Sequence, residues 1–134
     1  MGFKIMQHAN GKLLEQLYAD FSKGDLSAVL GACAENITFQ IAGKSKVAGK
    51  YTKADFASGF VAKLMELSGG SLQVEVHDIL ASDRHAVVLV SDHLTRKGEK
   101  IQIRSAHVWR FENSKPVAFY EYPRDMYQYD SIWS

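Results

Sequence analysis

The sequence predicts an α+β domain in which helices pack on one face of a strongly curved antiparallel sheet. Two observations lead to this fold class. Before Gly70 the apolar residues recur mainly at helical spacing, and after Gly70 they alternate with a period of two over four long segments. Short turns join these segments, so consecutive strands should pair as an antiparallel meander. The length suits one domain that spans residues 1–134.

Helical spacing marks two elements near the start of the chain. Apolar residues between positions 11 and 24 fall on one stripe, and Gly24 ends it. Asp25 then stands where it can cap a second, shorter helix that ends at Glu35. A short strand rich in branched and aromatic residues is expected to follow at residues 36–43.

A loop and a third helix precede the meander. Residues 44–53 are polar and contain glycine, which predicts a solvated loop. Thr52 and Asp55 have the spacing of a capping box, and an apolar stripe continues from there to Gly69 and Gly70. We therefore expect a long helix in this region. The four strands of the meander are expected at residues 72–82, 85–96, 100–112 and 115–125.

Charge and composition exclude several classes of protein. With 16 basic and 15 acidic residues the net charge is +1, so no strong field attracts nucleic acid or an anionic membrane. The single cysteine, Cys33, cannot form an internal disulfide, which fits a reducing compartment. Residues 1–12 contain no apolar run typical of a signal peptide, and no later segment has the length of a membrane span. We expect a soluble, cytoplasmic protein that binds neither nucleic acid nor membranes.

One predicted strand places a histidine among aromatic side chains. In the stretch QIRSAHVWRF, Ser105, His107 and Trp109 share a face. Burying an imidazole without a partner costs roughly 1–3 kcal/mol, so His107 should have a structural partner or a ligand to serve. The same alternation is expected to turn His93 and Glu121 toward this face from neighbouring strands. A proton could pass between these groups, because imidazole titrates at about pH 6.5 and a nearby carboxylate raises its pKa.

Longer stretches of the sequence resemble one superfamily. YADFSKGDLSAVLGACAENITFQIAG resembles the opening of SnoaL-like proteins, in which a helix ends at a Gly-Asp pair and a second helix precedes an ItF strand. VAGKYTKADFASGFVAKL is similar to that family's glycine loop and long helix, and HVWRFENSKPVAFYEYPRDMYQYD to its last hairpin. The resemblance implies the cone-shaped, cystatin-like fold of nuclear transport factor 2 and ketosteroid isomerase. In it, a curved antiparallel sheet wraps around the long helix, with two helices at the N-terminus.

The resemblance also implies differences from the ketosteroid isomerases. Their proton-shuttling aspartate corresponds to Ile41, which cannot carry a proton. Their first-helix tyrosine corresponds to Leu17, with Tyr18 adjacent, and the strand aspartate of their oxyanion hole corresponds to His107. Plain steroid isomerisation is therefore not expected.

Two other activities of the same fold provide a further comparison. In limonene-epoxide hydrolases an Arg-x-Asp pair on one strand and an aspartate on the last strand activate water, and the matching positions are Ser91, His93 and Glu121. The arginine is therefore missing. In SnoaL-like cyclases an acid/base residue faces the cavity from the sheet, which again indicates the region of His107.

These residues predict an apolar pocket served by acid/base chemistry. We expect His107 to act as a general base, oriented by Glu121 or His93, in an isomerase, cyclase or hydratase without a cofactor. The substrate would be a small hydrophobic carbonyl or cyclic compound. No metal is expected, because the sequence contains no motif with the spacing of metal ligands. The alternative is a non-catalytic module of the same fold that binds a hydrophobic ligand or acts as a dimerising accessory protein. The expected pocket lining is Tyr18, Phe39, Phe60, Trp109, Ser105 and Phe119.

Two further surfaces are expected to be apolar. The tail DMYQYDSIWS carries several aromatic side chains, so it should either fold over the pocket mouth or pack at a dimer interface. The outer face of the sheet is expected to present Val88, Val90, Ala106 and Val108 among polar residues. Such a face suits a twofold contact between sheets, so a homodimer is expected.

Overall fold

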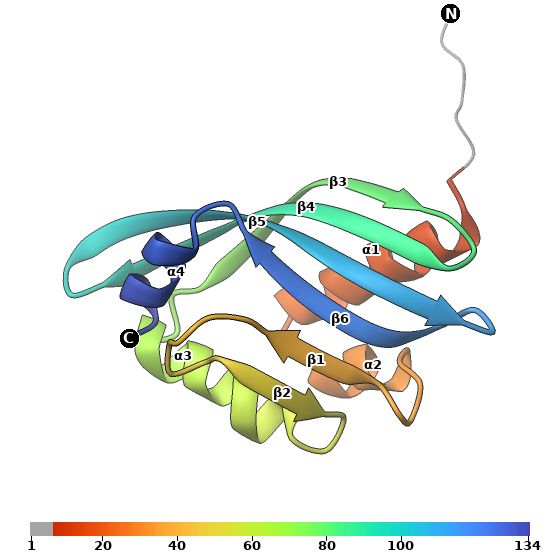
Figure 1. The fold of residues 1–134 in the computed structure, drawn as a ribbon, viewed down its shortest axis with the longest axis horizontal. Coiled ribbons are helices and arrows are strands. Elements are labelled where there is room, and N and C mark those ends of the chain that lie inside the picture. The colour runs from red at the N-terminus through yellow and green to blue at the C-terminus, as the bar shows by residue number, and fades with distance from the viewer. Residues whose placement is uncertain (1–6) are drawn as a thin grey trace, which may run out of the picture.

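Six strands form one curved sheet in the computed structural model, which describes residues 7–134 (Figure 1). Their order is β2-β1-β6-β5-β4-β3, and every neighbouring pair is antiparallel except β1 and β6, which run parallel. The predicted α+β class and the antiparallel meander from β3 to β6 are confirmed. The strands are β1 (Thr38–Ile41), β2 (Gly49–Thr52), β3 (Gln73–Ala81), β4 (His85–Arg96), β5 (Glu99–Glu112) and β6 (Lys115–Pro123).

Helices pack against the concave side of this sheet. Asp25 caps α2 as expected, since its carboxylate accepts the backbone N–H of Ala28 at 3.0 Å. Gly24, which separates the first two helices, has a φ of 76°, a conformation that glycine adopts without strain. The helices are α1 (Ala9–Ser22), α2 (Leu26–Gly31), the π-helical segment η1 (Phe56–Val61), α3 (Ala62–Ser68) and α4 (Met126–Ile132).

The β5–β6 hairpin sets the register on which the site depends. Asn113 and Ser114 at its turn both have positive φ values, 50° and 64°, as a type I′ turn requires. This turn matches the right-handed twist of the strands, so the two long strands pair closely. A register shift between Arg110 and Phe111 then places His107 directly opposite Glu121 and Trp109 opposite Phe119.

Two elements of the structure differ from the prediction: the expected loop at residues 44–53 and the expected long helix after it. Residues 44–53 include the strand β2, because Tyr51 packs into the core and donates its hydroxyl proton to the carbonyl of Val47 at 2.7 Å. The long helix begins as the wider π-helix η1 rather than as an α-helix. Gly59 lies against the ring of Tyr51, at a distance that leaves little room for a Cβ atom. The long-range contact with β2 was not visible in the local sequence pattern.

The strand β4 faces the other way from the prediction. Val88 and Val90 are buried against the interior, at 0% and 2% exposure, rather than on the outer face. Leu89 takes the outer position and lies in register with Ala106 on β5. The composition expected for the outer face was therefore wrong at both valines, while Val108 and Ala106 do lie there, half-buried. The homodimer itself stays a prediction.

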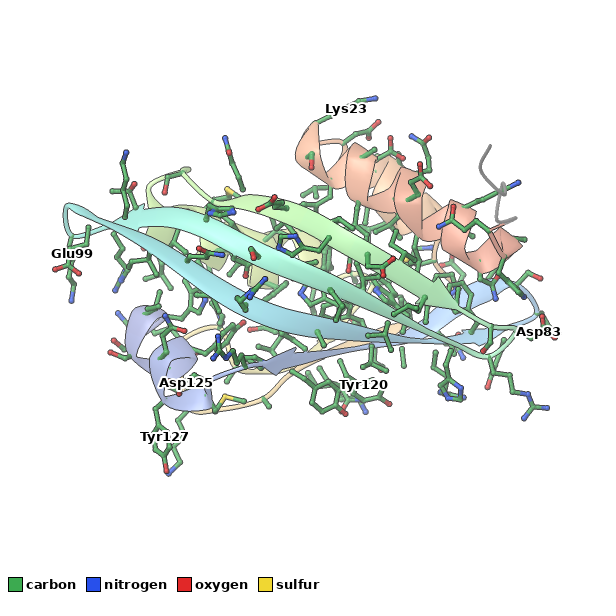
Figure 2. All side chains as sticks on the ribbon, turned by 90° about the horizontal axis from the view of Figure 1, so that it is seen from above. Lys23, Asp83, Glu99, Tyr120, Asp125 and Tyr127 are labelled. Carbon is green, nitrogen blue, oxygen red and sulfur yellow. The ribbon has the colours of Figure 1, made fainter. Side chains whose placement is uncertain are left out.

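The C-terminal tail folds back over one end of the interior. Asp125 caps α4, and Tyr129 and Trp133 are buried at 1% and 0% exposure. The backbone N–H of Lys46 donates to the carbonyl of Trp133 at 3.1 Å, which ties the tail to the loop before β2. Tyr127 is exposed and points away from the protein body (Figure 2). The tail therefore closes one end of the interior, and its expected place at a dimer interface stays a prediction.

The described part of the chain contains no helix with the length and apolar character needed to cross a bilayer. Residues 1–6 belong to the segment in which no signal peptide was expected, and they lie outside the described residues.

Candidate active site

An internal cavity of about 70 Å³ lies between the helices and the concave face of the sheet. Most of its wall is apolar and comes from α1, η1, α3 and the inner face of the strands. Ligand pockets typically have volumes of roughly 300–1,000 Å³, so this cavity holds only a small chemical group. The polar side chains that reach it are Tyr18, Asp92, His107, Glu121 and Tyr129.

His107 is the centre of a chain of hydrogen bonds in this cavity. Its Nε2 lies 3.3 Å from Oε2 of Glu121, and its Nδ1 lies 2.6 Å from the hydroxyl of Tyr18. The Tyr18 oxygen also accepts the indole N–H of Trp109 at 3.1 Å. Tyr129 donates its hydroxyl proton to the other oxygen of Glu121 at 3.2 Å. Both ring nitrogens of His107 and both oxygens of Glu121 are therefore engaged.

The protonation state of His107 decides which way these hydrogen bonds point. Burial by itself lowers the pKa of His107, but the Glu121 carboxylate opposes this through its charge and its hydrogen bond, and the Asp92 charge adds to the effect. The net pKa is raised above its ordinary value, which favours the imidazolium. An imidazolium donates from both nitrogens, so the Tyr18 oxygen accepts two N–H groups. Its own proton is then free to point into the cavity.

Tyr18 keeps that proton under ordinary conditions. Burial raises the pKa of its hydroxyl well above the usual value, and the charges of Glu121 and Asp92 act in the same direction, against the opposing hydrogen bond from Trp109. The ring lies on α1, stacked near His107 at a centroid distance of 5.8 Å. Tyr18 is therefore a fixed hydrogen-bond donor at the cavity wall.

Asp92 is the titratable group of this cavity that has no partner. It lies on β4 at 7% exposure, and its side chain makes no hydrogen bond within residues 7–134. Burial, followed by the charge of Glu121, raises the pKa of Asp92 to about 7, against the opposing effect of His107. A carboxyl group whose pKa is raised toward neutral pH suits the uptake and return of protons.

His93 does not belong to this cluster. Its Nε2 lies 2.8 Å from Oε1 of Glu75 on the outer face of the sheet. The inward positions of β4 run through Val90, Asp92 and Leu94, which are all buried. The expected inward orientation of His93 was therefore wrong by one residue.

The residues expected to line the pocket lie at the cavity with one exception. Ser105 faces the interior from β5 but is not part of the cavity wall, and its buried hydroxyl has no hydrogen-bond partner among the described residues. No group of three or more potential metal ligands occurs within residues 7–134. The expected side chains that do line the cavity are Tyr18, Phe39, Phe60, Trp109 and Phe119.

A family profile for the SnoaL-like domain matches residues 14–119. The chain belongs to the SnoaL-like family. The SnoaL-like fold extends to solved structures, among them Bal32a from a soil-derived mobile gene cassette. That structure is 21% identical, with a TM-score of 0.85, over 94% of this chain and 97% of that chain. Among curated proteins, none matches this sequence.

Two other solved structures share the SnoaL-like fold. A nuclear transport factor 2-like protein of unknown function from Burkholderia pseudomallei is 21% identical, with a TM-score of 0.83, over 96% of this chain and 99% of that chain. TerC, crystallised with polyporic acid, is 17% identical, with a TM-score of 0.81, over 95% of this chain and 100% of that chain. The family profile confirms the predicted superfamily, and the identities to these solved structures establish the fold only.

Two polar residues of this SnoaL-like cavity were not predicted. Asp92 could have been found from the alternation of β4, because Ala86, Val90 and Leu94 form the more apolar of its two faces. Tyr129 was visible only as one of several aromatic residues in the tail. Its contact with Glu121 depends on how α4 folds back, which no local pattern specifies.

Proposed function

We propose that the protein is a cofactor-independent enzyme that moves a proton on a small hydrophobic carbonyl compound, a step common to isomerisation and cyclisation. The observation that carries this proposal is Asp92, an unpartnered carboxyl group with a pKa of about 7 in an apolar cavity. A hydrogen-bond donor, Tyr18, lines the same cavity. Enolisation requires a base whose pKa lies near the working pH. It also requires a hydrogen-bond donor that is already in place for the developing oxyanion.

In the proposed reaction, the Asp92 carboxylate removes a proton from the carbon next to the substrate carbonyl. The electron pair of the broken C–H bond forms the C=C bond of an enolate, and the carbonyl π pair moves to oxygen. Tyr18 donates its hydroxyl hydrogen bond to that oxygen, where negative charge develops. Protonated Asp92 exchanges this proton with solvent through the open side of the cavity and then returns a proton to carbon, so the enzyme ends in its starting state and deuterium enters the substrate in D₂O.

His107 has a different role in this proposal from the general base expected from the sequence. Both of its ring nitrogens are engaged, so it would have to break a contact with Tyr18 or Glu121 before it could accept a substrate proton. As an imidazolium, it instead strengthens Tyr18 as a donor. Glu121, held by Tyr129, balances the imidazolium charge. His107 and Glu121 are thus positioning residues.

Relatives of the same fold are consistent with chemistry on small organic molecules. TerC was crystallised with polyporic acid, and AclR is described as a putative hydroxylase, with a TM-score of 0.67. For this chain, the proposed function rests on the apolar cavity and on the charged side chains that line it.

Deuterium exchange tests the proposal directly. The protein is incubated with butanone in D₂O, and the loss of α-protons is followed by ¹H NMR. We expect Asp92→Asn to slow the protein-dependent exchange by roughly 10²–10⁴-fold, the usual contribution of a general base. Asp78→Asn, the same substitution at an exposed site on β3, serves as the control and should exchange at the wild-type rate.

The outcome also separates the two functions considered from the sequence. Exchange that persists in Asp92→Asn would contradict the role of Asp92 as the base. A wild-type protein that binds butanone but exchanges no deuterium would favour the non-catalytic ligand-binding module.

A further inference from the structure

The cavity opens toward solvent on one side. The lining side chains that are half-buried rather than buried are Tyr18 and Phe21 on α1, and Leu72 and Val74 around the start of β3. The remaining wall residues are buried. In Figure 2, α1 runs alongside β3. The opening therefore lies between this helix and this edge strand.

A surface crevice of about 250 Å³ continues outward from this opening. It shares Tyr18 and Val74 with the internal cavity, so these two side chains border both spaces. Farther out, Ala19 forms its helix side, and Val76 and Ile79 form its strand side. These side chains are apolar, and Val76 is 36% exposed. The crevice thus extends the apolar wall of the cavity to the protein surface.

We propose that the cavity and the crevice together form one elongated binding site for an apolar chain that carries a carbonyl group near one end. The carbonyl end lies in the cavity at Asp92 and Tyr18, and the hydrocarbon chain lies between α1 and β3. The placement of the ligand's carbonyl end in the cavity rests on the proposed function. The cavity alone, at about 70 Å³, is far smaller than typical ligand pockets, whereas the cavity and the crevice together reach the lower end of the usual range of volumes.

The charges along the crevice favour a neutral chain. No basic side chain lines the crevice in the described part of the structure, and Glu15 lies at its edge. An anionic group at the outer end of a ligand would meet this carboxylate without a cation to balance it. The site therefore suits methyl ketones and related neutral compounds better than fatty acids.

Chain-length dependence of binding tests this site. Dissociation constants for butanone and 2-nonanone are measured by isothermal titration calorimetry on the wild-type protein and on two variants. Ala19 lines the crevice but not the cavity, so Ala19→Trp fills the crevice and leaves every cavity-lining residue unsubstituted. Ala62→Trp makes the same change at an exposed position of α3 that lines neither space, and serves as the control.

In the wild type, affinity should rise about fourfold for each methylene that enters the crevice. Ala19→Trp should weaken the binding of 2-nonanone at least tenfold and leave butanone unchanged, while Ala62→Trp should change neither. If Ala19→Trp does not fold, the smaller Ala19→Leu should still weaken 2-nonanone selectively.

Three results would overturn the elongated site. They are equal effects of the crevice variant on both ketones, undiminished 2-nonanone binding in that variant, and no binding of either ketone. Failure of the proposed function looks different. In that case Asp92→Asn would retain deuterium exchange, or the wild type would show none, while the dependence on chain length and on Ala19 persisted.

Discussion

The sheet carries a histidine–glutamate pair on each of its faces. On the inner face, His107 and Glu121 are 3.3 Å apart with side chains that are 8% and 5% exposed. On the outer face, His93 and Glu75 are 2.8 Å apart with side chains that are 45% and 55% exposed. The outer pair has the shorter contact, yet solvent screens its charges, whereas the inner pair interacts in a medium of low dielectric constant. Burial, rather than the presence of a pair, makes the inner face a candidate for chemistry.

The largest difference between the two faces is expected in stability, when the glutamate is removed from each pair in turn. Glu121→Ala leaves the His107 N–H and the Tyr129 hydroxyl without their acceptor, and breaking such a buried pair typically lowers the free energy of unfolding by about 3–5 kcal/mol. Glu75→Ala removes an exposed partner and should change stability little. Urea denaturation of both variants measures the difference. Equal losses would show that the buried pair is no more important for stability than the exposed one.

The pH dependence of stability should also distinguish the buried Asp92 from the exposed Asp78. Because the pKa of Asp92 is raised in the folded state to about 7 from an ordinary 3.8, its protonated form stabilises the fold at low pH. That contribution is lost as pH rises through about 7, and amounts to as much as about 4 kcal/mol. We expect Asp92→Asn to lose less stability than the wild type between pH 4 and pH 8 in urea unfolding. Asp78→Asn should follow the wild-type pH dependence.

The two tail tyrosines extend the comparison to single hydroxyl groups. Tyr129→Phe removes a hydrogen bond to the buried Glu121 and should lower the free energy of unfolding by about 2 kcal/mol. Tyr127 is 91% exposed, so Tyr127→Phe should have no measurable effect. Chemical denaturation is again the measurement. A Tyr129→Phe variant as stable as the wild type would mean that Glu121 does not need this donor.

The smallest expected effect concerns the titration of His107. NMR of the imidazole signals should show a pKa above the ordinary 6.5, because Glu121 outweighs the effect of burial. In Glu121→Gln the carboxylate charge is absent, so the pKa should fall toward or below that value while the fold is retained. A pKa that does not move would contradict the assignment of the imidazolium to Glu121.

Sequence reasoning worked best where local chemistry fixes the geometry. Gly24 and Asp25 bound the first two helices as expected, and the alternation of β5 and β6 turned His107 and Glu121 to the same face as expected. Their direct pairing depends on a register shift between Arg110 and Phe111, which the alternation did not predict. The face of β4 was harder to assign. Val87 and Leu89 on the outer face resemble Val88 on the inner face, so two apolar alternations compete on one strand.

The elements that were missed depend on distant parts of the chain. The strand β2 is stabilised by the contacts of Tyr51 with the interior, and its own residues are mostly polar. Tyr129 reaches Glu121 from α4, and Trp133 in the same tail is buried in the core. Such contacts are set by tertiary packing, which local periodicity does not encode.

The parallel pairing of β1 with β6 has a consequence for the order of folding. This pairing places Ile41 beside Glu121, so it joins segments far apart in the sequence and requires a large loop to close. The hairpins between β3 and β6 need only short closures, and we expect them to form first. Pulsed hydrogen exchange should protect β4 and β5 amides before those of β1. The cavity that holds Asp92, His107 and Glu121 would then be enclosed only in the last stage of folding, when the chain is already compact.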